Sequence, residues 1–143
     1  MSNFAKFMKA NKVEKQNTFY AATKSIVDEN GKPVEWELKP ISSRDNSRLR
    51  EDCMKEVPIV GKPNMYRQKI ETTKYISALL IASCVSPNLY DTELQDSYGV
   101  KTPEDLLYAM VDDPGEYDEF VAFVQKFNGF NSTLEDKVEE AKN

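Results

Sequence analysis

The stretch that decides the fold reads Thr18-Phe-Tyr-Ala-Ala-Thr-Lys-Ser-Ile-Val27, then Asp28-Glu-Asn-Gly-Lys-Pro33, then Val34-Glu-Trp-Glu-Leu-Lys-Pro-Ile41. Two strand-like runs flank an Asn-Gly pair. That pattern is typical of a β-hairpin closed by a two-residue type I′ turn, because both central residues of this turn take positive φ. We therefore predict a hairpin over about residues 18–41, with Asn30 and Gly31 as its turn residues.

A two-residue turn also fixes which residues face each other. It places Val27 opposite Val34 and Ser25 opposite Trp36, and it puts Lys24 beside Glu37 on the other face as a favourable charge pair. An isolated hairpin is only marginally stable in water. One face, carrying Trp36 as its largest side chain, is therefore expected to pack against helices.

Helical signals follow the hairpin. Ser42 or Ser43 can cap a helix that runs to about Lys55, and an apolar stripe predicts a central helix over 71–85. A short helix over 91–98 ends at Gly99, and Thr102-Pro103 opens the next. Asp113-Pro-Gly-Glu116 predicts a capping box at the start of a helix that ends at Gly129, and Ser132-Thr-Leu-Glu135 predicts another before 134–141.

These elements predict one α+β domain over residues 1–143, mainly α, in which the N-terminal hairpin packs on a bundle of about five short to medium helices. Residues 1–15 are expected to form a short, frayed helix that docks on the domain. Residues 131–143 are expected to form an acidic and mobile C-terminal helix. Five residues are assigned structural roles at turns, caps and the core: Asn30, Gly31, Trp36, Gly99 and Gly129.

The composition argues against catalysis. The chain of 143 residues has no histidine, which removes Ser-His and Cys-His nucleophile pairs and the usual general base near neutral pH. Its five glycines form no phosphate-binding motif, and its acidic clusters lack the spacing of a calcium loop. We therefore expect a binding protein with no catalytic residue, no metal site and no cofactor.

The cellular setting is also constrained. Two cysteines, Cys53 and Cys84, cannot build a disulfide framework and are expected to be reduced and partly buried. The longest apolar stretch, Ile76–Val85, is shorter than the roughly 20 residues that span a bilayer, and the N-terminus lacks a signal peptide. These features favour a cytoplasmic protein without a membrane partner.

The charge is divided along the chain. Residues 1–90 hold 15 Lys and Arg against 10 Asp and Glu, whereas residues 91–143 hold 4 against 14. This polarity allows association with a partner or with a second copy of the chain. A nucleic-acid-binding regulator is the less favoured alternative, because the acidic half would repel phosphates. It would use these basic and aromatic residues: Arg44, Arg48, Arg50, Arg67, Lys69, Lys74, Tyr20, Trp36 and Tyr66.

Exposed apolar side chains supply candidates for a protein-binding surface. The segment Val57–Tyr66 holds two prolines and a glycine and is predicted to be an extended loop or a short irregular strand, either exposed or folded over the core. The late helices and the acidic C-terminal stretch are the other candidates. The residues chosen are Ile59, Val60, Met65, Tyr66, Tyr117, Phe130, Leu134 and Val138.

An ordered series of motifs resembles a known family. The series includes Phe19-Tyr-Ala-Ala-Thr-Lys24, Gly31-Lys-Pro-Val-Glu-Trp-Glu-Leu-Lys-Pro40, Gly61-Lys-Pro-Asn-Met-Tyr66, Leu94-Gln-Asp-Ser-Tyr-Gly-Val100, Pro103-Glu-Asp-Leu-Leu107, Pro114-Gly-Glu-Tyr117 and Phe127-Asn-Gly-Phe130. Together with the tail Leu134–Asn143, it is similar to the XkdN-like tail assembly chaperones of phages and prophages such as PBSX. Each motif alone has little specificity; their order over nearly the whole chain carries the resemblance.

The resemblance implies a partner and a place of action. A chaperone of this kind would bind the tape-measure protein in the host bacterial cytoplasm and keep it soluble before the tail tube polymerises around it. It would not remain in the mature tail, and an extended frameshift product would recruit the tail-tube protein. A structural tail component is the remaining alternative. The family carries over no catalytic residue and no partner-binding position.

Overall fold

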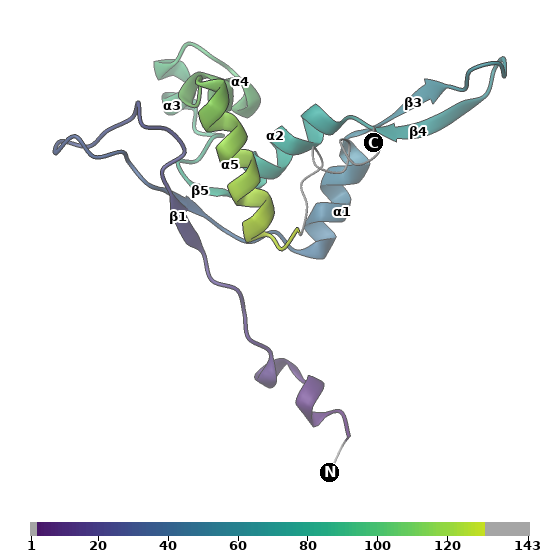
Figure 1. Ribbon diagram of the computed structural model, residues 1–143, viewed down its shortest axis with the longest axis horizontal. Helices are drawn as coiled ribbons and strands as arrows, with labels where there is room; N and C mark the ends of the chain where they lie inside the picture. The colour runs from purple at the N-terminus through teal and green to yellow at the C-terminus, as the bar shows by residue number, and fades with distance from the viewer. Residues whose placement is uncertain (1–2, 131–143) are drawn as a thin grey trace.

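The N-terminal hairpin is present in the computed structural model, which describes residues 3–130. Strands β1 (Thr18–Tyr20) and β2 (Trp36–Leu38) pair antiparallel, and β5 (Cys84–Ser86) adds to the other edge of β2, giving a sheet of order β1-β2-β5. Residues 18–41 therefore supply two of the three strands on which the helices pack (Figure 1). The predicted α+β class with a hairpin near the N-terminus is confirmed.

The predicted register and turn type are wrong. Trp36 pairs with Tyr20 instead of Ser25, and Phe19, not Lys24, lies opposite Glu37. At the tip, the Asp28 N–H donates to the Lys32 carbonyl at 2.8 Å and the Gly31 N–H to the Asp28 carbonyl at 3.0 Å. Only Gly31 of the Asn-Gly pair has positive φ, at 80°. This is a three-residue loop of a type I turn and a glycine bulge.

Four of the helices begin at side-chain caps, three of which the sequence predicts, the fourth being Asp91. Ser42, Asp91, Thr102 and Asp113 each accept a backbone N–H in the first turn, and Pro103 and Pro114 are the first residues of their helices. The described caps therefore follow local chemistry. The helices are α1 (Ser43–Asp52), α3 (Thr92–Ser97), α4 (Pro103–Met110) and α5 (Pro114–Phe127).

The central helix is shorter than predicted. Helix α2 (Thr72–Ser83) stops before Cys84, and the chain continues as β5 in place of a last helical turn. Leu38 pairs with Cys84 and Glu37 with Ser86, so this segment completes the sheet. Val85, the last residue of the predicted helix, is 41% exposed because the side chains of a strand alternate between its two faces.

The core lies between the sheet and helices α2, α4 and α5. Trp36 is 1% exposed and forms a T-shaped pair with the Phe120 ring of α5, with centroids 5.4 Å apart. Tyr20 stacks on Phe123 at 4.2 Å. After α5 ends at Phe127, Gly129 (φ 86°) reverses the chain, and the Phe130 N–H donates to the Gln125 carbonyl in a Schellman motif.

Two segments extend from this body in Figure 1. Strands β3 (Met54–Pro58) and β4 (Tyr66–Ile70) form a separate two-stranded sheet between α1 and α2. The N-terminal segment forms two single turns of 3-10 helix, Ala5–Phe7 and Lys9–Asn11. Phe7 is 75% exposed, so the prediction that this segment docks on the domain is wrong. The helix predicted for 134–141 lies outside the described residues.

Candidate protein-interaction surface

The β3–β4 hairpin, called the arm here and defined as residues 54–70, contains no buried residue. Five pairs run from Met54↔Ile70 at its root to Pro58↔Tyr66 near its tip. The root is tied to the body by the Glu71 N–H, which donates to the carbonyl of the buried Cys53 at 2.8 Å. Beyond this point the arm projects away from the helices (Figure 1).

Four of the predicted contact residues lie at the tip of the arm. The Ile59 N–H donates to the Met65 carbonyl at 3.0 Å, which closes the loop on β3 and β4. Val60 is 98% exposed, Met65 52% and Tyr66 58%. The structure therefore brings Ile59, Val60, Met65 and Tyr66 together, on a two-stranded arm instead of the predicted loop or irregular strand.

The arm has two chemically different sides, because residues paired across an antiparallel sheet lie on the same face and alternate along each strand. Met54, Pro58, Tyr66 and Ile70 share one side with the Glu56–Gln68 pair. The other side holds four residues, three of them cationic: Lys55, Val57, Arg67 and Lys69. Lys55 lies directly opposite Lys69, an arrangement that repulsion makes unfavourable.

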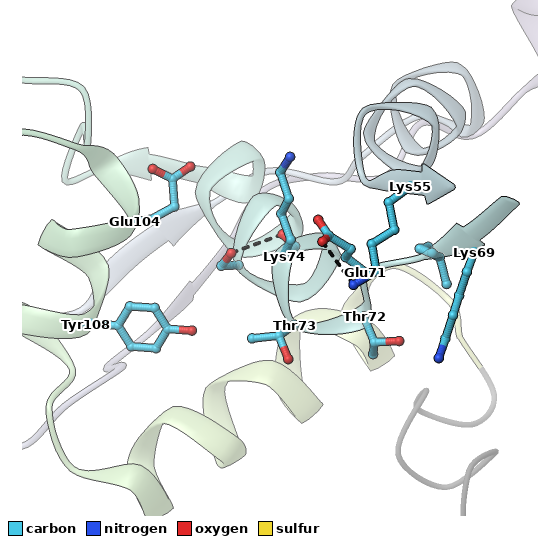
Figure 2. Close-up of a pocket in the computed structure, with 10 residues that line it drawn as sticks. Lys55, Lys69, Glu71, Thr72, Thr73, Lys74, Glu104 and Tyr108 are labelled. Carbon is cyan, nitrogen blue, oxygen red and sulfur yellow. Dashed lines mark hydrogen bonds and ion pairs between the residues drawn. The ribbon is translucent and has the colours of Figure 1, made fainter. Parts of the chain in front are cut away.

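An open groove of about 550 Å³ continues from this basic side at the root of the arm (Figure 2). Lys55 and Lys69 form one end, the first turn of α2 forms its floor, and Glu104 and Tyr108 of α4 form the far wall. Lys55 contacts Glu71 at 3.4 Å, and the Lys74 ammonium donates to the Asp52 carbonyl at 3.4 Å. Within residues 3–130, neither Arg67 nor Lys69 forms an ion pair.

The remaining predicted contact residues do not join the tip. Tyr117 is half-buried on α5 and stacks on Tyr108 at 5.2 Å, and burial raises the pKa of its hydroxyl. Phe130 packs against the core after the end of α5. Leu134 and Val138 lie outside the described residues. The described candidates thus occupy three places: the arm tip, the Tyr108–Tyr117 pair and the C-terminal end of α5.

The basic and aromatic residues considered for nucleic-acid binding separate in the structure. Arg67, Lys69 and Tyr66 lie on the arm, but Trp36 is buried under α5 and Tyr20 is stacked in the core. Neither ring offers the open face on which a base stacks. The sequence patterns do not predict that Arg67 and Lys69 lie beside Lys55, although the separation of Arg67 from Lys69 by Gln68 is a period-two signal.

The described residues supply little for metal or membrane chemistry. Among residues 3–130, no group of three or more Cys, Asp or Glu side chains could hold a metal ion. No helix within the same range is both long and apolar enough to cross a membrane. Both cysteines are free thiols, and burial raises the pKa of Cys84 to about 12.

Comparisons with known proteins give the class. The model of the phage XkdN-like tail assembly chaperone family matches residues 4–142, so the chain belongs to this family. Membership implies partners among the proteins of a phage tail.

Two relatives come from Bacillus subtilis strain 168. The chain is similar to the phage-like element PBSX protein XkdN, with 24% identity over 137 residues, 96% of this chain and 91% of the relative. It is 23% identical to protein YqbN over the same shares of the two chains. A crystal structure of the protein YqbN superposes with a TM-score of 0.73 at 17% identity, covering 92% of this chain and 99% of that one, and so shows the same fold.

Proposed function

We propose that this chain binds the tape-measure protein of a phage tail and keeps it soluble before the tail tube polymerises. The observation that carries the proposal is the apolar tip of the arm, where Val60, Met65 and Tyr66 are held outside the core. Family membership supports a tail-protein partner. The specific partner is our inference.

The physical argument starts from the cost of exposing apolar groups. Clustered apolar side chains on a projecting element are typical of contact surfaces, because their exposure to water is unfavourable unless a partner covers them. The strands of the arm bury no residue fully, so packing on the body contributes little to its stability. A two-stranded hairpin of this kind is marginal alone, and a bound partner would stabilise it.

A tape-measure protein is a long helical chain whose apolar stripes cause aggregation when they meet one another. The tip and the adjoining Tyr66 and Pro58 side can cover such a stripe, while the charged side of the arm keeps the complex in solution. We propose that this happens in the host cytoplasm, without catalysis, and that the chaperone leaves before the tail is complete.

The test is co-expression with the tape-measure protein of the same phage or prophage, followed by measurement of its soluble fraction. Val60→Ser with Tyr66→Ser should reduce that fraction several-fold. Val13→Ser with Tyr90→Ser is the matched control, because Val13 (92% exposed) and Tyr90 (66%) are as accessible as Val60 and Tyr66 but lie outside the arm. The control should retain the wild-type effect.

Two results would count against the proposal. A tape-measure protein that is equally soluble without this chain needs no chaperone of this kind. Equal losses in both double variants would show that general surface polarity, not the arm tip, controls solubility. Finding the chain at many copies in purified tails would favour a structural tail component instead.

A further inference from the structure

We propose that the basic side of the arm and the groove at its root bind an acidic stretch of the partner polypeptide. This inference rests on the proposed function, because the acidic stretch is assigned to the same tail protein whose apolar stripe contacts the arm tip. It assigns a second, electrostatic site to a surface distinct from that tip.

The first argument is charge without internal compensation. Residues 54–70 hold Lys55, Lys62, Arg67 and Lys69 against the single acid Glu56. Arg67 and Lys69 have no carboxylate partner within residues 3–130, and Lys69 faces Lys55 directly across the sheet. An acidic ligand would reduce this repulsion, which remains in the free protein.

The second argument is shape. The groove has a volume of about 550 Å³ and is lined by three lysines, Lys55, Lys69 and Lys74, at its arm end and floor. Tyr108, 44% exposed, offers an aromatic face on the far wall (Figure 2). An extended peptide with carboxylates at one end and an apolar side chain at the other matches this order of groups.

A polypeptide fits these observations better than a nucleic acid. Glu71 and Glu104 line the same groove, and residues 91–130 hold ten acids against two lysines. A continuous phosphate backbone crossing this surface would meet both carboxylates and the acidic helices beyond them. A peptide can place its acids beside the lysines and uncharged residues beside Glu104.

The experiment uses the full-length chain and two probes. One is fluorescent poly-L-glutamate of about 20 residues, and the other is the tape-measure protein of the same phage or prophage. The test variant is R67E/K69E, and the matched control is K9E/K12E, which changes the net charge equally on the exposed N-terminal segment. We expect R67E/K69E to fold, because K69E sets a carboxylate opposite Lys55. Circular dichroism checks both variants.

We expect R67E/K69E to weaken poly-L-glutamate binding roughly tenfold or more, and K9E/K12E to change it less than about threefold. Binding to wild type should weaken as salt rises from 0.05 to 0.3 M. The tape-measure complex of the Val60→Ser/Tyr66→Ser variant should weaken more steeply with salt than that of R67E/K69E, because charge pairs then supply more of its binding. Equal effects of the two charge variants would overturn the inference.

Three other outcomes would also overturn it. Single-stranded DNA that binds as tightly as poly-L-glutamate and is lost in R67E/K69E would assign the site to nucleic acid. Poly-L-glutamate that binds tightly only after Glu135→Gln, Asp136→Asn, Glu139→Gln and Glu140→Gln would assign the groove to the chain's own C-terminal stretch. A tape-measure complex that forms with wild type but is unaffected by R67E/K69E would refute this site and leave the proposed function intact. No complex with wild type would refute the proposed function itself.

Discussion

The carboxylate of Glu116 accepts a hydrogen bond from the hydroxyl of Thr23 at 2.7 Å, joining the first turn of α5 to the segment after β1. Its second oxygen accepts the backbone N–H of Lys24, also at 2.7 Å. Thr23 is 1% exposed, and its oxygen accepts the Ser25 N–H at 3.1 Å. This contact holds residues 21–25 against α5 instead of in the hairpin ladder.

Removing the Glu116 carboxylate should therefore destabilise the fold. We expect Glu116→Ala to lower the free energy of unfolding by about 1.5–3 kcal/mol, because Thr23 is left buried and loses a charged partner. Glu119→Ala, an exposed acid one turn along α5, should cost less than about 0.5 kcal/mol. Urea denaturation measures both, and equal costs would show that the Glu116 contact contributes nothing specific.

The same contact explains why sequence patterns could not give the register. The Asn30-Gly31 signal is local and correctly places a reversal of the chain, and Asp28 completes it by accepting the N–H groups of Asn30 and Lys32 at 2.8 and 3.0 Å. Four additional residues on the β1 side then displace the pairing so that Tyr20 meets Trp36. Their placement depends on Glu116, 93 positions from Thr23.

Elsewhere too, features set by neighbouring residues are predicted correctly, whereas features set by tertiary contacts are not. The caps at Ser42, Asp91, Thr102 and Asp113 bond within two or three residues, so the sequence shows them directly. Glu116 was predicted to close a capping box but bonds to Thr23 and Lys24 instead. The arm escaped prediction because neither of its sides is buried, which removes the apolar alternation that marks a strand.

The turn itself can be tested with two substitutions. Gly31 has φ of 80°, whereas Asn30 has no positive φ. Gly31→Ala should cost about 1 kcal/mol of unfolding free energy, because a β-carbon disfavours that conformation. Asn30→Ala should change it by less than about 0.5 kcal/mol. Equal losses at the two positions would support the type I′ turn that the structure lacks. Thermal denaturation of both variants provides the comparison.

Alkaline pH should weaken the protein through its thiols. The pKa of Cys84 is raised by burial from 9.0 to about 12, and burial also raises that of Cys53. Above pH 9 the unfolded chain loses these protons, while the folded chain keeps that of Cys84 and loses that of Cys53 at a higher pH than the unfolded chain does. The free energy of unfolding therefore falls as pH rises, by up to about 1.4 kcal/mol per pH unit for each thiol.

Cys84→Ala isolates one of these contributions. Between pH 9 and 10 its unfolding free energy should fall by about 1 kcal/mol less than that of wild type, because by pH 10 unfolded Cys84 has lost most of its protons while folded Cys84 keeps them. Urea denaturation at pH 7.5, 9 and 10 measures the slopes. Tyr20, Tyr75 and Tyr117, whose pKa values are raised from 10.0, also begin to contribute in this window, but they contribute equally to both proteins, so the difference between the two slopes isolates Cys84. Equal slopes of unfolding free energy against pH in the two proteins would show that Cys84 has the same pKa in the folded and unfolded chain.

The end of α2 offers a substitution that should stabilise the protein. Ser83 is completely buried, and its hydroxyl has no hydrogen-bond partner among the described residues, whereas the Ser77 hydroxyl on the same helix donates to the Lys74 carbonyl at 3.0 Å. Ser83→Ala removes an unsatisfied buried polar group and should raise the free energy of unfolding by about 1 kcal/mol. Ser77→Ala gains the same helix propensity but loses the hydrogen bond to the Lys74 carbonyl. Its free energy of unfolding should therefore be about 1 kcal/mol lower than that of Ser83→Ala. Denaturation curves for the two variants test this order, and a Ser83→Ala protein less stable than Ser77→Ala would mean that the Ser83 hydroxyl is satisfied in solution.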